Sequence, residues 1–599
     1  MLVYGDIERT ETVGAKQAFV TNLLSEAFTM PPGIARHGVL VTAFIGASEL
    51  VQGLIDAEFH ERGFDARSAD HAAGMECLSI LAQAVKESWR SSFGALSPLH
   101  PAFFEKLHGF DPSRTIRTKQ AEGYAFYALY PESYLEAARA SGLGLDTQVI
   151  GIRSIGAGLS ALVAAELGAP APITLRPVGH PFGREVRVDP DLTKSLTSES
   201  RKTFAIVDEG PGLSGSSFGA VADWLEEAGI SRDQIHFFPS HGGALGPQAS
   251  VRHQARWSSA PRHLATMDDL LLRGAPVQHL ESWVEDLLGP LDQPLEEISG
   301  GAWRSRRYPD EGSWPSANIQ QERRKFLARA NGTAWLVKFA GLGETGAQKF
   351  QMARQLHEAG FTPEPAACRH GFIVERWHEG LDSLDCARIS RESLVDQVGA
   401  YLAFRARHFP EAEDQGASLD ALRQMAIYNT GQALGEDVAA ALEQSLADPS
   451  IIEHKVRRIC TDNRLHAWEW LVSSDRLIKT DALDHSAAHD LVGHQDVSWD
   501  IAGAIIELDL SEAEATRLCR IVGQESGRRV DQALLAFMLP CYLAFQLGAH
   551  LMAAGSLGEG PETIRLRQAG DRYGRRIHDH VNRSGSPEPS QEQEEVPAS

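Results

Sequence analysis

Two adjacent carboxylates, Asp208 and Glu209, directly follow a short apolar run and precede a loop rich in glycine, proline and serine. The stretch reads FAIVDEGPGLSGSSF over residues 204–218. Backbone amides at the start of a helix favour an anion, because the N–H groups and the helix dipole both point toward it. Two carboxylates can stand beside a phosphate if they hold ribose hydroxyls and a divalent cation. The stretch therefore predicts a site for a phosphorylated sugar, and the alternative is an ordinary glycine loop with an exposed acid pair.

The elements around this stretch alternate between strands and helices. TQVIGIRSIGAGLSALVAAELG, from residue 147, is typical of a strand, a glycine turn and a helix, and the same order follows from residue 203. Such alternation predicts a doubly wound parallel sheet in an α/β multidomain protein. Ligands of open α/β sheets bind at the carboxyl ends of the strands, which is where Asp208 and Glu209 would lie.

Together these motifs resemble the type I phosphoribosyltransferases over about residues 115–250. The resemblance implies that Asp208 and Glu209 contact the ribose of phosphoribosyl pyrophosphate (PRPP) in a Mg²⁺-dependent site. The loop after the acids is one residue longer than is usual in that family. By the same resemblance, the residues that bind the 5′-phosphate or the pyrophosphate are Arg153, Ser154, Gly156, Gly158, Arg176, Arg184, Gly212, Ser214, Gly215, Ser216 and Ser217.

A dinucleotide-binding interpretation competes for some of these residues. GAGLSA (156–161) follows a predicted strand and opens a helix, as the GxGxxA fingerprint does. That fingerprint expects an acid about 20 residues later, where this chain has Arg176. An NADP-dependent oxidoreductase therefore stays open as an alternative, although it leaves Asp208 and Glu209 unexplained.

The second half of the chain carries a different constellation. Lys338 ends a predicted strand, Asp462 stands in a polar loop, and Asp481 follows another short β-run. Phosphoryl transfer needs a lysine for nucleotide phosphates, an acid that orients the acceptor and an acid that holds Mg²⁺. Residues of about 300–580 resemble the aminoglycoside-phosphotransferase and protein-kinase-like fold. That resemblance assigns ATP binding to Lys338, catalysis to Asp462, the metal to Asp481 and a bracing role to Asp500.

The second half also departs from that family at three points. Thr461 precedes Asp462, where the family usually has His-Gly. Ala467 stands five residues after Asp462, where a metal-binding Asn is expected, and His466 or Glu469 would have to substitute. The helix after Lys338 offers only Glu344 or Glu358 as its acidic partner. An unusual kinase and a nucleotide-binding pseudokinase therefore both stay open, and the second would make the protein a non-catalytic nucleotide sensor.

Two smaller features have alternative interpretations. His485 and His489 are four residues apart near Asp484, His494 and Asp496, a spacing that fits a transition-metal site or hydrogen-bonding side chains. EGYAFYALYPESY (122–134) is rich in aromatic residues. These rings either pack in the core or stack a base near the ribose site.

Composition limits the class of protein. The 599 residues include 57 Lys and Arg against 80 Asp and Glu, a net charge of −23. This charge excludes a general nucleic-acid or anionic-membrane binder. The six cysteines are scattered, and the first residues lack the apolar segment of a signal peptide, so we expect a cytoplasmic protein. Oligomeric state cannot be deduced from the sequence.

The sequence predicts four segments: a mainly helical region (1–110), the phosphoribosyltransferase-like domain (111–295), the two-lobed kinase-like domain (300–580) and a disordered tail (581–599). We expect a transferase of nucleotide metabolism, with PRPP, ATP and a base or other small acceptor as substrates. It would combine glycosyltransferase chemistry with phosphorylation of a ribosylated small molecule. Because 300–320 is rich in turn residues, we also expect residues 1–300 and 301–599 to fold separately.

Overall fold

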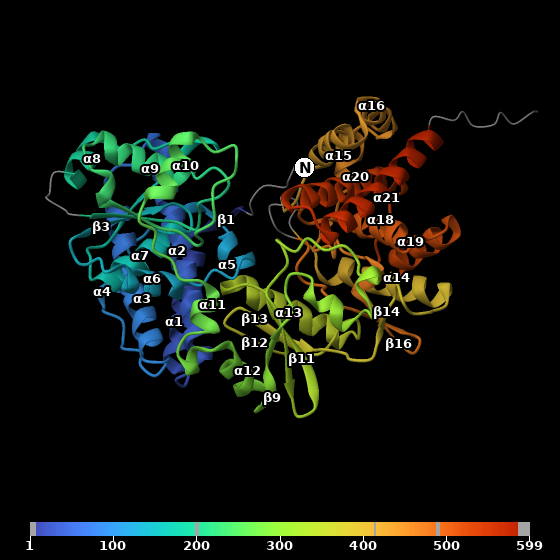
Figure 1. The fold of residues 1–599 in the computed structure, drawn as a ribbon, viewed down its shortest axis with the longest axis horizontal. Helices are drawn as coiled ribbons and strands as arrows, with labels where there is room; N and C mark the ends of the chain where they lie inside the picture. The colour runs from blue at the N-terminus through green and yellow to red at the C-terminus, as the bar shows by residue number, and fades with distance from the viewer. Residues whose placement is uncertain (1–7, 198–202, 412–414, 487–490, 585–599) are drawn as a thin grey trace, which may run out of the picture.

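A computed structural model describes residues 8–197, 203–411, 415–486 and 491–584. The two halves of the chain lie side by side, the first coloured blue to green and the second yellow to red (Figure 1). The predicted tail begins four residues too early, because the last helix, α21 (Pro561–Ser584), extends to residue 584. The rest of that predicted tail lies outside the described residues.

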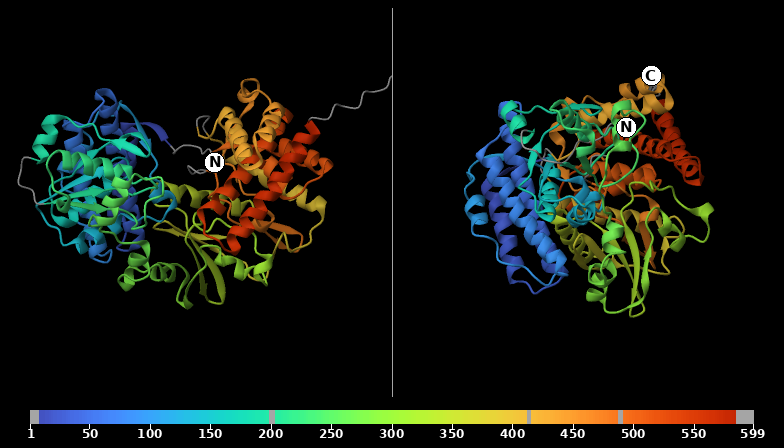
Figure 2. Two further views of the ribbon diagram at one scale, coloured as in Figure 1. Left: turned by 45° about the horizontal axis from the view of Figure 1, so that its top comes forward. Right: turned by 60° about the vertical axis from the view of Figure 1, so that its left-hand side comes forward.

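Long helices form the N-terminal layer, as the apolar spacing predicts. They are α1 (Val13–Thr29), α2 (Ile34–Arg62) and α3 (Ala69–Arg90), which run side by side (Figure 2). The side chains of Thr12 and Ser68 cap α1 and α3 by accepting hydrogen bonds from backbone amides. By length and composition α2 could cross a membrane, as could a later helix, α20 (Gln532–Ser556), but 78% and 67% of their apolar windows are buried. Both are core helices of this protein.

The predicted parallel sheet is present. Its order is β4–β3–β7–β8 and all three pairings are parallel. The strands are β3 (Thr147–Ile152), β4 (Ile173–Leu175), β7 (Thr203–Val207) and β8 (Ile235–Phe238). Every residue of β3 is buried, as expected where helices cover both faces of a sheet. Asp208 and Glu209 directly follow β7, at the carboxyl end of this sheet.

The glycines of α7 (Gly156–Leu167) serve close packing. A Cβ atom on Gly158 would lie 2.4 Å from Ser48 Oγ of α2, and one on Gly156 would lie 2.7 Å from the carbonyl oxygen of Val207. Only glycine lets α7 approach both neighbours this closely. The GxGxxA pattern thus has a structural cause that needs no dinucleotide.

Shorter elements complete the first half. Two further strand pairs are antiparallel: β1 (Glu8–Thr12) with β2 (Thr115–Lys119), and β5 (Val178–His180) with β6 (Gly183–Glu185). The remaining helices are α4 (Ala102–Leu107), α5 (Glu122–Phe126), α6 (Pro131–Ser141), α8 (Pro190–Thr197), α9 (Ser216–Glu227), α10 (Val251–Ser259), α11 (Met267–Leu271) and α12 (Leu280–Leu288).

A five-stranded antiparallel sheet opens the second half, in the order β12–β13–β11–β10–β9. Its strands are β9 (Leu291–Glu297), β10 (Lys325–Ala330), β11 (Thr333–Phe339), β12 (Pro365–Arg369) and β13 (Phe372–Arg376). Asn331 and Gly332 connect β10 to β11 with φ of 52° and 70°. Positive φ at both positions is typical of the tight two-residue hairpin turn that an Asn-Gly pair favours. Helix α13 (Gly343–Glu358) follows β11 and packs beside this sheet.

A helical lobe follows the sheet. Its helices are α14 (Arg391–His408), α15 (Leu419–Leu434), α16 (Glu436–Ser445), α17 (Pro449–Ile452), α18 (Val497–Glu507), α19 (Glu512–Ser526), α20 and α21. Short strands lie at its inner edge: β14 (Asp382–Ser383), β15 (Arg458–Ile459), β16 (Trp470–Ser473), β17 (Arg476–Lys479) and β18 (Gln495–Asp496). The β16–β17 hairpin carries the polar loops that face the sheet.

The two halves share one core, which contradicts the expectation that they fold separately. One hydrophobic cluster runs from α1 through α7 to β10, β11 and β13. At its centre His37 and His370 place Nε2 at 2.7 and 2.9 Å from the same oxygen of Glu132, and all three side chains are buried. A cut after residue 300 would also separate β9 from its sheet. Turn residues around 300–320 mark an insertion in the second half, not a linker.

Candidate functional site

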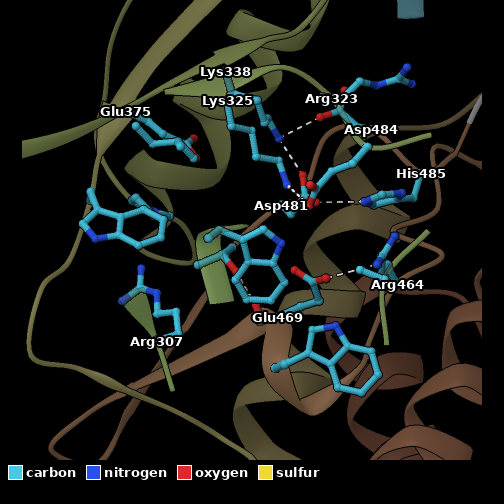
Figure 3. A pocket seen from close by; sticks show the side chains of 18 of the residues that line it. Arg307, Arg323, Lys325, Lys338, Glu375, Arg464, Glu469, Asp481, Asp484 and His485 are labelled. Carbon is cyan, nitrogen blue, oxygen red and sulfur yellow. Dashed lines mark hydrogen bonds and ion pairs between the residues drawn. The ribbon is translucent and has the colours of Figure 1, made fainter. Parts of the chain in front are cut away.

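A cavity of about 190 Å³ lies between the five-stranded sheet and the helical lobe (Figure 3). We call it the cleft. The sheet and the lobe both contribute charged side chains to its lining. These are Lys325, Lys338, Glu375, Arg464, Glu469, Asp481, Asp484 and His485.

Lys338 is the centre of the charged cluster. Its Nζ lies 2.6 Å from Asp481 Oδ1 and 2.7 Å from Asp484 Oδ2, and the lysine side chain is only 3% exposed. Burial alone would lower the pKa of Lys338 and raise the pKa of both aspartates. Their mutual attraction outweighs burial and shifts each pKa the opposite way, so all three groups stay charged.

Helix α13 supplies a cation to this cluster. Lys349 Nζ lies 2.7 Å from Asp484 Oδ1. The two acids that the sequence offered as partners of Lys338 have other partners: Glu344 pairs with Arg9 at 3.1 Å and Glu358 with Arg354 at 3.5 Å. Asp484 therefore holds two lysines, one from the sheet and one from α13. Its position three residues after Asp481 was the sequence signal that could have identified it.

Asp481 has an uncommon backbone conformation. Its φ is 50°, in the left-handed region, which aspartate adopts more readily than most residues. Backbone outliers of this kind concentrate at functional sites. The conformation places one carboxylate oxygen beside Lys338, while the other lies 3.2 Å from His485 Nε2.

The histidine cluster does not converge on one point in the described residues. His485 pairs with Asp481, and His494 Nε2 lies 4.0 Å from Glu411. His489 lies outside the described residues. Asp496 caps α18 by accepting a hydrogen bond from the Ser498 amide. The described members thus favour the hydrogen-bonding interpretation.

Asp462 lies beneath the cleft and does not line it. Its side chain is buried, accepts a hydrogen bond from Tyr401 Oη, and lies 3.4 Å from Lys479 Nζ and 3.9 Å from Arg405 Nη1. These partners hold the carboxylate inside the helical lobe. To contact an acceptor hydroxyl, as the sequence predicts, Asp462 would have to turn toward the cleft.

Asp500 braces the loop that contains Asp462. It accepts hydrogen bonds from the backbone amides of Asp462 and Asn463, both at 2.8 Å. Burial and the nearby Asp462 carboxylate together raise the pKa of Asp500 to about 6, against the opposing effect of Arg405. This geometry matches the bracing role that the resemblance assigns to Asp500.

Glu469 occupies the cleft near the place where a metal-binding Asn was expected. Its Oε1 accepts a hydrogen bond of 3.0 Å from Arg464 Nε. His466, the other candidate substitute, faces Tyr573 Oη at 3.3 Å inside the lobe. Ala467 begins the short turn that presents Glu469. Of the two substitutes, Glu469 is the one that lines the cavity.

A long connection between β9 and β10 covers the cleft. This strap, residues 298–324, is anchored on the far lobe by Arg304, which lies 2.8 Å from Glu562 of α21. Glu562 also accepts a hydrogen bond of 2.7 Å from the Ala317 amide. Arg307 donates to the carbonyl of His378 at 2.5 Å. The strap therefore ties the sheet to the helical lobe and encloses the cavity.

A second, larger cavity of about 1030 Å³ lies at the carboxyl end of the parallel sheet. We call it the sheet cavity. Seven predicted residues line it: Ser154, Arg184, Asp208, Glu209, Gly212, Ser214 and Ser217. Burial raises the pKa of Asp208 to about 7, although Arg184, Arg176 and Lys119 act in the opposite direction. Asp208 thus lies in an environment that disfavours its charge.

The other predicted phosphate contacts lie outside this lining. Arg153 is buried, with Nε 2.8 Å from Asp56, and it also pairs with Asp65. Arg176 pairs with the same Asp56. Gly156 and Gly158 serve the packing of α7, Gly215 caps α9, and Ser216 Oγ donates to the Pro181 carbonyl at 2.5 Å. Arg153 and Arg176 therefore act as internal counter-ions of the fold.

In the second half, the sheet that carries Lys338 is followed by α13, and the helical lobe presents Asp481 and Asp484 to the same cleft. No family model and no curated protein matches the chain. Solved structures that match include choline kinase from Streptococcus pneumoniae, with 15% identity, TM-score 0.29, 43% of this chain and 89% of the other covered.

A second match is a spectinomycin phosphotransferase in complex with ADP and spectinomycin, with 11% identity, TM-score 0.33, and 51% of this chain and 97% of the other covered. A third is a thermostable mutant of an aminoglycoside phosphotransferase, with 13% identity, TM-score 0.32, and 51% of this chain and 100% of the other covered. These scores are low. The resemblance of the second half to the kinase-like fold therefore stays a prediction from the order of its motifs.

Proposed function

We propose that the kinase-like half transfers a phosphoryl group from ATP to a hydroxyl group of a small molecule, with Mg²⁺. The observation that carries this proposal is the cluster of Lys338, Asp481 and Asp484 inside an enclosed cleft. A buried lysine suits nucleotide phosphates, and paired carboxylates supply the oxygen ligands that Mg²⁺ prefers.

The existing ion pairs suggest how the cleft accepts its ligand. Lys338 and Asp481 neutralise each other at 2.6 Å. A nucleotide phosphate would take the place of Asp481 beside Lys338, and Mg²⁺ would take the place of Lys338 beside Asp481. Each buried charge keeps a partner through this exchange, so ligand entry avoids the cost of an unpaired buried charge.

The cleft lining also holds basic side chains that an anionic acceptor could use. Arg323, Lys325 and Arg464 line it in addition to Lys338. Lys325 and Arg464 each lie 3.0 Å from a lining glutamate, so an anionic acceptor would take the place of that glutamate. Guanidinium groups bind phosphate and carboxylate in a bidentate geometry. A 5′-phosphorylated riboside fits this lining, and it is the ribosylated acceptor that the sequence predicts.

We further propose that the sheet cavity binds PRPP with Mg²⁺. Support comes from Asp208 and Glu209 at the carboxyl end of β7, and from Arg184, Ser214 and Ser217 in the same lining. Asp208, whose charge is disfavoured by burial, gains most from a bound cation. Transfer of the phosphoribosyl group to a base or other acceptor would follow from this binding.

Thermal-shift titration with ATP, PRPP and NADPH, each with and without Mg²⁺, tests both parts. We expect stabilisation by ATP and by PRPP that depends on Mg²⁺, and none by NADPH. Asp481→Asn should remove the ATP response, and Asp437→Asn, an exposed aspartate on α16, is the matched control. Stabilisation by NADPH alone would favour the oxidoreductase. ATP binding without Mg²⁺ and without phosphoryl transfer would favour a nucleotide sensor.

A further inference from the structure

The cleft and the sheet cavity are neighbours, separated by the short helix α5. Gly123, near the start of α5, lies against Glu209 of the sheet cavity: a Cβ atom there would be 2.8 Å from the Glu209 carboxyl carbon. Phe126, the last residue of α5, lies under Arg323 of the cleft, with the guanidinium 4.8 Å from the ring centre. Five helical residues rise only about 7 Å. One short helix therefore contacts both candidate sites, and α5 lies where the first half of the chain meets the second (Figure 1).

Tyr127, which directly follows α5, lines both cavities. It is 49% exposed, whereas Tyr124, Phe126, Tyr130 and Tyr134 of the same aromatic segment are buried. The buried rings follow the core-packing interpretation of this segment. Tyr127 is different, because it is half-exposed and lines both sites.

The backbone holds Tyr127 in a fixed position. Its amide donates to the Gly123 carbonyl at 3.2 Å, and the Leu129 amide donates to the same oxygen at 3.1 Å. Between them Ala128 has a φ of 52°. Arg323 fixes the other side, since its Nη1 donates to the Phe126 carbonyl at 2.6 Å. The turn that presents Tyr127 is thus tied to both halves of the protein.

Adjacent arginines of the strap divide between the same two sites. Arg323 lines the cleft and Arg324 lines the sheet cavity. Each site therefore has a guanidinium of the strap in its lining. Aromatic and cationic contacts together suit a phosphorylated molecule that also carries an aromatic ring.

We propose that Tyr127 is a ligand-binding side chain common to both cavities, where it stacks the aromatic base of a 5′-phosphorylated riboside. This inference rests on the proposed function. In the sheet cavity the acceptor nitrogen of the base bonds to C1 of the ribose, and the bond from C1 to pyrophosphate breaks. The electron pair leaves on pyrophosphate, which also takes up the proton that the acceptor nitrogen loses. In the cleft a riboside hydroxyl bonds to the γ-phosphorus of ATP, ADP leaves, and the hydroxyl proton passes to a cleft carboxylate. The base stays on Tyr127 while the ribose moves from one site to the other.

Binding of nucleoside monophosphates tests this proposal. AMP, GMP, CMP and UMP are titrated into the full chain twice: once with the cleft filled by Mg²⁺ and a non-hydrolysable ATP analogue, and once with the sheet cavity filled by PRPP and Mg²⁺. At least one monophosphate should bind in both states. Tyr127→Ala should weaken that binding about 5- to 150-fold in both, as expected for loss of one base stack. Tyr127→Phe keeps the ring and should bind as the wild type does.

Tyr428→Ala is the matched control, because Tyr428 on α15 is 47% exposed and lines neither cavity. Two outcomes would show that Tyr127 does not bind ligand in both cavities, while the proposed function stands. In the first, Tyr127→Ala weakens binding in only one state. In the second, no monophosphate binds although ATP and PRPP do. If the wild type binds neither ATP nor PRPP, the proposed function itself fails.

Discussion

The paired aspartates of the cleft and Asp208 of the sheet cavity are in opposite electrostatic states. In the cleft, Lys338 and Lys349 lie within 2.7 Å of aspartate oxygens, and the pKa of both aspartates is well below the usual range. In the sheet cavity, burial raises the pKa of Asp208 to about 7. The protein's own lysines neutralise the aspartates of the cleft. In the sheet cavity, the nearby cations do not offset the effect of burial on the pKa of Asp208.

This difference predicts different behaviour toward ligands. A ligand of the cleft must replace existing ion pairs, so removing one protein charge disrupts both folding and binding. A cation that enters the sheet cavity relieves an existing energetic cost, so removing the acids there disrupts binding but not folding.

Lys338→Ala should have the largest effect. It leaves Asp481 and Asp484 with fewer positive partners in a buried site, which typically costs about 3–5 kcal/mol of stability. We expect a fall of this size in the free energy of unfolding, measured with urea, together with loss of ATP binding. Lys194→Ala, an exposed lysine on α8, should change stability by less than about 0.5 kcal/mol. Unchanged stability of Lys338→Ala would mean that the cleft is not internally neutralised.

The double variant Asp208→Asn, Glu209→Gln tests the opposite case. Mg²⁺-dependent PRPP binding should disappear in calorimetry, while the free energy of unfolding at pH 8 should stay the same or rise, because a disfavoured buried charge is removed. Retained PRPP affinity would remove the phosphoribosyl interpretation of the sheet cavity.

The pH dependence of PRPP binding should show a smaller effect. Below a pKa of about 7 Asp208 is protonated, and a cation must displace the proton. Mg²⁺-dependent affinity should therefore fall by up to tenfold per pH unit from about pH 7 to pH 5, and level off above pH 7. The raised pKa also means that the contribution of Asp208 to stability is lost as pH rises from about 4 through 7. Asp208→Asn should show neither dependence, and an identical slope in this variant would assign the titration to another group.

Much of the fold was predictable from local patterns. The parallel sheet followed from strand and helix alternation, and the acids after β7 followed from their position at a strand end. Lys338, Asp481 and Asp500 were identifiable from their places near short regular elements: Lys338 lies near the end of β11, Asp481 follows β17, and Asp500 lies in the first turn of α18. In the structure Lys338 contacts Asp481, and Asp500 contacts the loop that holds Asp462.

Long-range packing was not predictable in the same way. The ion pairs of Arg153 with Asp56 and Asp65 join residues about 90 positions apart, and nothing in a glycine turn signals them. Lys349 sits on a helix face whose orientation depends on the sheet. The shared core around Glu132 depends on contacts between halves that look separate in composition. Each of these features depends on tertiary contacts and leaves no local sequence signal.

The central claim is that Asp481 and Lys338 exchange partners when a nucleotide and Mg²⁺ enter the cleft. Calorimetric titration of ATP into the wild type and Asp481→Asn, each with and without Mg²⁺, tests it most directly. We predict that Mg²⁺ strengthens ATP binding to the wild type, and that Asp481→Asn binds ATP equally with and without the metal. Equal Mg²⁺ dependence in both proteins would contradict the claim.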